Sequence, residues 1–456
     1  MTNNLFNIAS RLSKITHKPD ELKEIQVFFT KNDWRTDQQQ TLYNYCKQWK
    51  LVPWIWVQMN RLGLTDNLDK SIETDFREFY EKVRTENENR NKEAARFLKI
   101  FTREGIDVAV LKGNLLLHTV YKDAGYKKMN DFDMLIHPDD WTKVQKIYQN
   151  LDYIPLGFGW GGEKGKAVKF SHAGLSFISP NYHCITGTQW GLKSPTSKYS
   201  VPMDDLWKTT SSFTFEGVPI KQLSTPYNLL HLILHMGTFK CGIRDCMDIF
   251  NLLLADKDWD ENYFVDICKQ SNAIDKAWFT FQLTNMCSGV VPDSLLEKLK
   301  PPKKSFMVRR YYSRKKMADK TGDMQFSYND YFHDVEMTVF YFSLIHKFHQ
   351  KAYFYYQLVR QMFRPERDMT KRLSDLTGKP EFWEMLKARL KAPYLVFALI
   401  GEEIGIGVVI LLFIKMFLET IISLKNYIFK KESYFTYLKN RGIDPEEIKK
   451  VVKGIQ

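Results

Sequence analysis

The stretch from residue 106 to residue 136 constrains the fold most, because it holds two apolar segments of strand length joined by a short helical pattern. Residues 106–111 (IDVAVL) predict the first strand, which ends in Lys112-Gly113-Asn114. Residues 132–136 (FDMLI) predict the second, which begins at Asp131-Phe132-Asp133. Side chains alternate across a strand, so the two carboxylates share one face. The stretch therefore predicts an α/β core with paired acids at the exposed entrance of a strand.

These residue types suit phosphate chemistry. Carboxylate oxygens are preferred ligands of Mg²⁺, so Asp131 and Asp133 are candidate metal ligands. A strand followed by a glycine turn and a helix start is a plausible phosphate cradle, which makes Gly113 and Asn114 candidates for that role. Lys112 can neutralise phosphate charge. The alternatives are a solvated Asp-x-Asp loop and a solvated lysine at a strand end, and the pattern alone leaves them open.

The order of these residues resembles a known family. Leu-Lys-Gly, a helix, Tyr121, a basic residue at Lys127 and Asp-Phe-Asp-Met-Leu-Ile are similar to bacterial nucleotidyltransferases of the polymerase-β-like superfamily. The closer resemblance is to a largely uncharacterised branch in which Leu-Lys-Gly replaces a Gly-Ser turn. Similarity continues over residues 89–111 and 223–254, and covers roughly residues 30–255. The resemblance implies an α+β fold, with a small mixed-sheet domain flanked by helical N- and C-terminal regions.

The same resemblance implies an activity and assigns residues to it. The activity is transfer of a nucleotidyl group from an NTP such as ATP to an acceptor, dependent on Mg²⁺ or Mn²⁺. Asp131 and Asp133 would be the catalytic metal ligands. Nucleotide-binding roles would fall to a second set, Lys112, Gly113, Asn114, Lys127, His235 and Arg244. Lys127 stands where arginine is more usual and lacks its bidentate geometry. For His235 and Arg244, a salt-bridged helical hairpin is the alternative.

One position departs from the family pattern. A third carboxylate is expected within residues 184–192, where Gly187 or its neighbour stands instead, and no Asp or Glu occurs between Glu163 and Asp204. Glu163, in the glycine-rich turn 157–163, is a possible substitute. Two hypotheses therefore remain. The chain is either a transferase, or a catalytically degenerate nucleotide-binding or membrane-associated scaffold of the same fold in a biosynthetic pathway.

Charge and cysteine content limit the partners and the compartment. The 66 basic and 53 acidic residues give a net charge of +13, which favours phosphate-bearing partners such as nucleotides, nucleic acid or an anionic membrane surface. The acceptor class stays open among a small molecule, a saccharide, a peptide and RNA. The six cysteines form no Cys-x-x-Cys pair, which favours a reducing cytoplasm. We therefore expect a cytoplasmic protein, with peripheral association at the inner face of a membrane as an option.

The hydrophobic pattern divides the chain into four regions. We expect a helical region over 1–101, the nucleotidyltransferase α/β domain over 102–225, a helical domain over 226–330 and a helical C-terminal region over 331–456. Beyond the two strands already described, further strands are predicted near 168–178, 183–190 and 213–220. A helix is predicted over 138–150.

Two segments of the C-terminal half leave alternatives open. Residues 298–320 combine many basic residues with Tyr311 and Tyr312, which fits either single-stranded nucleic acid or a phosphorylated carrier, or else a solvated linker. The apolar tract 394–424 fits a buried core helix, a membrane-surface helix or a membrane span. The span is the weakest fit to the pattern, because Glu402, Glu403, Lys415 and Glu419 interrupt the tract.

Overall fold

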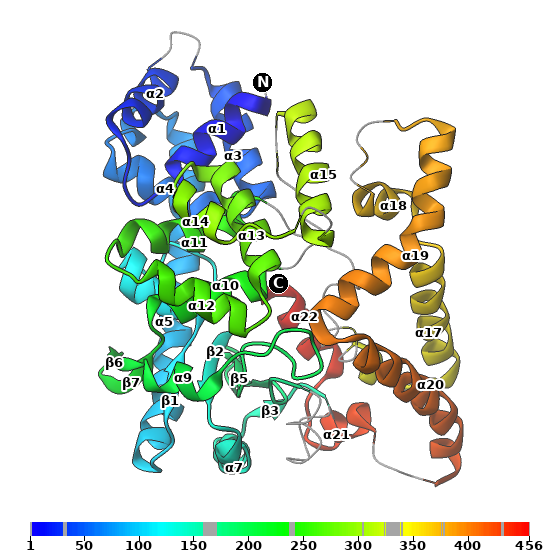
Figure 1. Ribbon diagram of the computed structural model, residues 1–456. Coiled ribbons are helices and arrows are strands. Elements are labelled where there is room, and N and C mark those ends of the chain that lie inside the picture. Colours follow the sequence, from blue (N-terminus) through cyan, green and yellow to red (C-terminus); the bar gives the residue numbers. More distant parts are fainter. Residues whose placement is uncertain are drawn as a thin grey trace. The chain divides into compact units, whose positions relative to one another are not determined.

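The computed structural model confirms an α+β fold with a mixed sheet (Figure 1). It describes residues 2–30, 34–157, 171–236, 242–302, 305–322, 324, 338, 341–374, 376, 379–429 and 433–455. The hypotheses on Glu163 and on most of its glycine-rich turn lie outside these residues, as do the side chains of Glu402 and Glu403. The chain forms two compact units. The first comprises Met1–Met134, Val201–Met236 and Lys240–Ser327, and the second comprises Leu135–Ser200, Gly237–Phe239 and Tyr328–Gln456.

The first unit contains the N-terminal helices, four strands that include the start of β2, and the helices that follow the sheet. Its elements are α1 (Thr2–Leu12), α2 (Pro19–Phe29), α3 (Thr36–Gln48), α4 (Val52–Arg61), η1 (Thr65–Asn67), α5 (Lys70–Arg103), β1 (Val108–Val110), α6 (Lys112–Leu116), η2 (Leu117–Tyr121), β2 (Phe132–Ile136), α9 (Met203–Lys208), β6 (Ser211–Phe215), β7 (Val218–Gln222), α10 (Thr225–His235), α11 (Ile243–Ala255), α12 (Glu261–Gln270), α13 (Ile274–Ser288), α14 (Asp293–Lys298) and α15 (Phe306–Thr321).

Helix α5 is the longest element and leads directly into the sheet. Asp69 caps its first turn by accepting a hydrogen bond from the backbone N–H of Ser71. Ile72, Phe76 and Val83 recur at helical spacing on its buried side. The helix ends at Arg103, and the chain then turns at Gly105 with a φ of +70°, a conformation that glycine adopts without strain. The amphipathic α5 thus packs by its apolar side and leads into β1.

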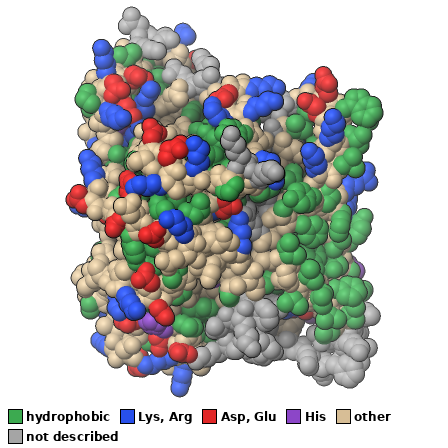
Figure 2. Space-filling model, viewed as in Figure 1, with side chains coloured by type: hydrophobic (Ala, Val, Ile, Leu, Met, Phe, Trp, Pro, Cys, Tyr) green, Lys and Arg blue, Asp and Glu red, His purple; other side chains and the backbone are tan. Residues whose placement is uncertain are grey.

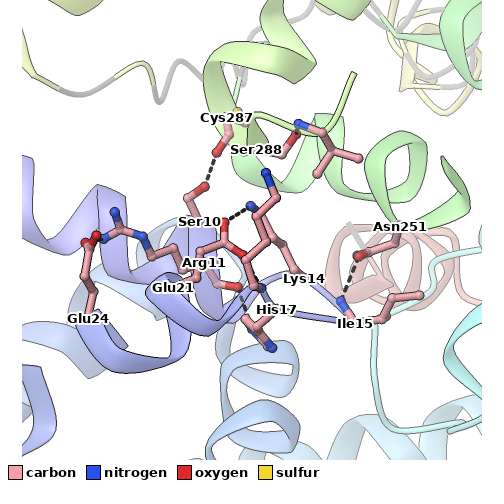
Figure 3. Close-up of polar contacts among 12 residues, drawn as sticks. Ser10, Arg11, Lys14, Ile15, His17, Glu21, Glu24, Asn251, Cys287 and Ser288 are labelled. Carbon is pink, nitrogen blue, oxygen red and sulfur yellow. Dashed lines mark hydrogen bonds and ion pairs between the residues drawn. The ribbon is translucent and has the colours of Figure 1, made fainter. Parts of the chain in front are cut away.

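Polar contacts attach the N-terminal helix to the helices that follow the sheet (Figure 3). The Ser10 hydroxyl of α1 donates to the backbone oxygen of Cys287 on α13. Within the N-terminal region, Lys14 forms an ion pair with Glu21 of α2. The Asn251 side chain accepts from the backbone N–H of Ile15 at 2.9 Å. It also donates to the backbone oxygen of Ser13 at 2.9 Å. Asn251 is fully buried. These bonds fix α11 against α1, and α11 also carries a carboxylate of the candidate site.

The sheet has seven strands in the order β3-β4-β5-β2-β1-β7-β6, with β3 (Ile154–Pro155), β4 (Phe177–Ile178) and β5 (Ile185–Gln189) completing the set. β1 pairs with β7 in parallel, whereas the pairs β3–β4, β4–β5 and β6–β7 are antiparallel. The register sets Ala109 opposite Lys221 and Phe213 opposite Ile220. The parallel pair requires the crossover that the intervening residues provide.

Two strand predictions were wrong in their limits. The single strand predicted over 213–220 is a hairpin, because Glu216 and Gly217 both have positive φ (47° and 76°) and reverse the chain between β6 and β7. The strand predicted over 168–178 is described only from residue 171 and is strand only at Phe177–Ile178. The helix predicted over 138–150 is present as η3 (Pro138–Asp140) followed by α7 (Trp141–Asn150).

The second unit contains the outer strands and the C-terminal helices. Its helices after the sheet are α17 (Phe348–Phe363), α18 (Arg367–Leu373), α19 (Phe382–Ile404), α20 (Ile406–Phe429), α21 (Tyr434–Asn440) and α22 (Pro445–Ile455). Ile154, Ile178 and Ile185 of the three outer strands share one hydrophobic cluster with Tyr434, Leu438, Ile448 and Val452. The Tyr434 hydroxyl donates to the backbone oxygen of Pro155 at 2.8 Å. The last two helices therefore cover the outer strands.

The basic segment 298–320 is not a solvated linker. Residues 306–321 form α15, in which Tyr311, Arg310 and Arg314 are buried. The Tyr311 ring packs edge-on against Trp278 of α13, with ring centroids 5.1 Å apart. Only Tyr312 of the aromatic pair is exposed. The aromatic residue counted as a base-stacking platform thus belongs to the core, where it fixes α15 on α13.

The corner between α19 and α20 depends on Gly405. Its φ of +87° is disfavoured for other residues, and a β-carbon there would lie 2.2 Å from the backbone oxygen of Thr196. We expect Gly405→Ala to lower the free energy of unfolding by about 1–3 kcal/mol. Gly407→Ala is the matched control, because no atom lies within 4 Å of its β-carbon position and alanine is the better helix former. Thermal unfolding of both variants checks this, and equal midpoints would contradict it.

Candidate functional site

Strand β2 positions the paired carboxylates by alternation. Phe132 points to one face and is fully buried, with its ring 5.7 Å from that of Phe97 on α5 and 5.2 Å from that of Phe215 on β6. The side chains of Asp131 and Asp133 therefore point to the other face. Asp133 is only 5% exposed. An acid this deeply buried needs a compensating cation.

The Lys-Gly turn supplies one such cation. The backbone N–H of Leu111 donates to the backbone oxygen of Asp133 at 3.0 Å, which ties the end of β1 to β2. Lys112 has a φ of +54°, an uncommon conformation for a residue other than glycine. Its Nζ lies 2.9 Å from Oδ2 of Asp133. The turn thus places an ammonium group directly on one of the paired carboxylates.

Gly113 lies against Met129 and Lys127, and Asn114 contacts the backbone of Asp131. A β-carbon on Gly113 would lie 2.6 Å from Sδ of Met129 and 3.4 Å from Nζ of Lys127, so a side chain there would displace both. Asn114 Nδ2 donates to the backbone oxygen of Asp131 at 3.0 Å. Within the described part of the chain, the buried Oδ1 of Asn114 has no hydrogen-bond partner. That oxygen is available to a donor on a ligand or water.

Lys127 is held over this turn by a buried network. It pairs with Asp248 of α11, whose other oxygen accepts a 2.7 Å hydrogen bond from the Tyr121 hydroxyl. Nζ of Lys127 also lies 5.6 Å from the ring centroid of Trp54, a cation–π distance. Burial and the neighbouring Asp248 raise the pKa of Tyr121, so its hydroxyl stays protonated and remains a donor. Three elements distant in sequence therefore fix the position of one ammonium group.

Buried polar residues of α5 hold the connection that precedes β2. Asn87 Nδ2 donates to the backbone oxygens of Ala124 and Lys127, at 2.6 and 2.7 Å. Its Oδ1 accepts from Nη1 of Arg90 at 2.5 Å and from the backbone N–H of Met129 at 3.3 Å. One amide thus fastens both sides of Lys127. Sequence reasoning missed Asn87 and Arg90, although polar residues on the otherwise apolar face of α5 were the available clue.

The carboxylates repel one another. Burial, followed by the charge of Asp133, raises the pKa of Asp131 to about 6, while the charges of Lys112 and Arg90 lower it. Because this pKa lies above the model-peptide value of 3.8, ionisation of Asp131 opposes folding. The contribution of Asp131 to the free energy of unfolding is fully present below pH 3.8 and is lost as the pH rises through about 6. A bound divalent cation would remove that penalty.

The cost of ionising Asp131 in the folded state leads to a prediction about thermal stability. At pH 7.5 without divalent cations, we expect Asp131→Asn to unfold at a higher temperature than the wild type, because the amide cannot ionise. At pH 4.5 the difference should shrink. Asp266→Asn, at an exposed position of α12, is the control and should leave the midpoint unchanged at both pH values. An Asp131→Asn protein less stable than the wild type at pH 7.5 would contradict the prediction.

The remaining predicted residues lie on helices that follow the sheet. His235 ends α10 at an exposed position, and its ring centroid is 6.4 Å from that of the buried His231. Arg244 is in the first turn of α11. Burial lowers the pKa of Lys128, with nearby basic groups including Arg244 contributing to the decrease. Roles for His235 and Arg244 in nucleotide binding stay predictions. Asp248, one turn beyond Arg244, instead pairs with Lys127.

The donor atoms present suit a divalent cation, but they are few. Among the described residues, no group of three or more His, Cys, Asp or Glu side chains could hold a metal ion. Strand β5 carries Gly187 where a third acid was expected. The two carboxylates, with the pKa of Asp131 raised, and the Asn114 amide oxygen without a partner fit a cation that takes its other ligands from phosphate oxygens and water.

Comparison with known proteins agrees with the resemblance found in the sequence. A family model described as "Uncharacterised nucleotidyltransferase" matches residues 35–289, which is more than half of the chain and includes every candidate residue. Neither the curated proteins nor the solved structures contain a match. The residues that place two acids beside a Lys-Gly turn thus lie within the matched segment, and the chain belongs to this uncharacterised nucleotidyltransferase family.

Proposed function

We propose that the protein transfers a nucleotidyl group from an NTP to an acceptor, and that Asp131 and Asp133 hold the divalent cation this requires. The observation that carries the proposal is the placement of this acid pair on a Lys-Gly turn with two ammonium groups, Lys112 on Asp133 and Lys127 close to Gly113. Acids alone would repel a triphosphate. The combination of acids and lysines matches a triphosphate that arrives with its cation.

Each residue has a distinct part in the proposed reaction. An acceptor oxygen forms a bond to the α-phosphorus, the bond from that phosphorus to the bridging oxygen of the β-phosphate breaks, and pyrophosphate leaves. Lys127 and the backbone at Gly113 would bind the departing phosphates. Lys112 would exchange Asp133 for a phosphate oxygen when the cation binds, because the cation then neutralises the carboxylate. When bound, the cation supplies Lewis-acid stabilisation of the charge that develops on the phosphate oxygens.

A label-transfer experiment tests the proposal. The full chain is incubated with each of the four NTPs, labelled at either the α- or the γ-phosphate, with Mg²⁺ or Mn²⁺ and a cell extract as the source of acceptors. The proposal expects α-label on an acceptor and γ-label in pyrophosphate. Both should be lost in Asp131→Asn and retained in the surface control Asp266→Asn. Label transfer that persists in Asp131→Asn would refute the assignment.

A second function is favoured by the missing acid. No Asp or Glu occurs between Glu163 and Asp204, so the chain has no acidic residue on β5 to activate an acceptor. A protein of this kind would bind the NTP with its cation without turning it over. Equilibrium binding of each NTP, with Mg²⁺ and with EDTA, distinguishes the two. Cation-dependent binding without pyrophosphate release would establish the binding protein.

A further inference from the structure

Helix α20 presents an apolar face to solvent. At about 3.6 residues per turn, its exposed residues follow one side of the helix. We call them the α20 stripe: Ile406, Ile410, Leu411, Ile414, Phe417, Leu418, Ile421 and Ile422, which are 38–55% exposed. The opposite side is buried through Val409, Met416 and Thr420. Of the alternatives for the tract 394–424, the buried core helix does not describe this side of α20, because one apolar face packs and the other does not.

Helix α19 repeats the arrangement. Its exposed apolar residues form the α19 stripe, which consists of Phe382, Trp383, Leu386, Leu390 and Tyr394, and four of the five are 65–75% exposed. The buried side carries Met385, Ala388 and Val396. Exposed contiguous apolar surface of this kind is rare on monomeric soluble proteins and marks an interaction site. Figure 2 shows hydrophobic side chains gathered over both helices.

The inner faces of these helices are already engaged. Both pack on α17, with the ring of Phe363 lying 5.8 Å from that of Phe397, and the ring of Tyr355 lying 6.1 Å from that of Phe413. Gly405 sets the corner between them against Thr196. The two stripes are therefore held on a packed scaffold rather than on loose helices, and they need no refolding to meet a partner.

Positive charge borders the α19 stripe on both sides. At helical spacing, Arg389 lies along one edge of the stripe, and Lys387 and Lys391 lie along the other, all three exposed. Lys415 borders the α20 stripe and lies 3.7 Å from Glu419. Lysine and arginine side chains bury their stems at an apolar surface and keep their charges in water. This arrangement complements lipid chains below the stripe and anionic headgroups beside it.

The geometry favours a helix lying in the surface rather than across it. The α20 stripe runs over 17 residues, about 24 Å at 1.5 Å per residue, and a bilayer core is about 30 Å thick. Among the residues that the structure describes, no helix is long and apolar enough to cross a membrane. A second copy of the chain fits less well, because a two-fold interface between the stripes would bring the bordering cations of one copy toward those of the other.

We propose that the α19 and α20 stripes dock the protein on an anionic lipid surface, with Arg389, Lys387 and Lys391 at the headgroups. Trp383 and Tyr394 suit the same boundary, where aromatic rings with one polar group are favoured. The proposal is independent of the proposed nucleotidyl transfer, since it concerns helices outside the family segment. Docking would concentrate the protein at a membrane without anchoring it there permanently.

Vesicle cosedimentation of the full chain tests docking. The vesicles are phosphatidylcholine alone, or phosphatidylcholine with one-third phosphatidylglycerol. The stripe variant carries Ile410→Gln, Ile414→Gln and Phe417→Gln, and the charge variant carries Lys387→Gln, Arg389→Gln and Lys391→Gln. The control carries Val27→Gln and Tyr312→Gln, at exposed apolar positions of α2 and α15. Thermal unfolding of each variant checks that its fold is intact.

We expect the wild type and the control to bind the anionic vesicles and not the neutral ones. The stripe variant should bind more than about 100-fold more weakly. The charge variant should lose roughly fivefold per cation, and so about 100-fold in all at low salt. Full binding by the stripe variant, no binding by the wild type, or equal binding to neutral vesicles would overturn the proposal. So would a wild-type dimer that the stripe variant converts to a monomer in sedimentation velocity, because the occupant would then be a second copy.

Discussion

Asp131→Asn and Asp133→Asn are each expected to slow nucleotidyl transfer by at least about 1,000-fold, equivalent to roughly 4 kcal/mol of lost transition-state stabilisation. The amide keeps the shape of the carboxylate and removes the charge that holds a divalent cation. Single-turnover transfer of α-label measures the effect. The two variants should differ in stability, because Asp133→Asn leaves Lys112 without its carboxylate whereas Asp131→Asn relieves a repulsion.

A second readout makes the same prediction testable in a protein with little turnover. In the wild type, the NTP affinity with Mg²⁺ should differ from the affinity with EDTA. In Asp131→Asn and in Asp133→Asn, the affinities with Mg²⁺ and with EDTA should be equal. Asp266→Asn is the matched control, since it removes a carboxylate from an exposed ion pair of α12. Wild-type rates in either site variant would refute the metal-ligand assignment. So would an unchanged Mg²⁺ dependence of NTP affinity.

Asp248→Ala is expected to lower the free energy of unfolding by about 3–5 kcal/mol. The substitution leaves the Lys127 ammonium, whose side chain is 14% exposed, without its carboxylate, and deprives the Tyr121 hydroxyl of its acceptor. A buried charge that loses its partner keeps its desolvation cost. NTP affinity should fall as well, because Lys127 is no longer held over Gly113. Chemical denaturation and NTP titration measure the two effects.

The surface pair of α12 provides the comparison. Asp266 and Lys269 are 3.0 Å apart and both are 62% exposed, so Asp266→Ala should change the free energy of unfolding by no more than about 0.5 kcal/mol. Asp248→Asn keeps an acceptor for Tyr121 and should be intermediate. Equal effects of Asp248→Ala and Asp266→Ala would show that the buried network contributes nothing beyond a surface ion pair.

The parts of the fold that depend on the local sequence pattern were predictable. Alternation and the apolar residues after Asp131 predicted β2 over its observed length, and the Lys-Gly turn follows β1 as expected. The hairpin of β6 and β7 was missed because its reversal depends on two residues, Glu216 and Gly217, inside an otherwise strand-like run. Local pattern therefore located β1, β2 and β5, but it missed the turn between β6 and β7 and the two-residue strand β3.

Other features depend on contacts that no local pattern encodes. Asp248 meets Lys127 across 121 residues of chain, so the sequence near either residue does not predict their ion pair. In the tract 394–424, nearly every residue of α20 is apolar, so hydropathy could not distinguish the face that packs on α17 from the face that meets solvent. Periodicity carries information only where the two faces of a helix differ.

The covering of the outer strands by α21 and α22 has a consequence for biosynthesis. Ile154, Ile178 and Ile185 leave the ribosome long before Ile448 and Val452, the residues with which they share a core. Strands whose apolar side chains wait for a distant segment are exposed to wrong pairing and aggregation in the meantime. The second unit is therefore expected to fold only after the residues of α21 and α22 have been synthesised. Its yield should depend more on chaperones than that of the first unit, whose segments are complete by Ser327.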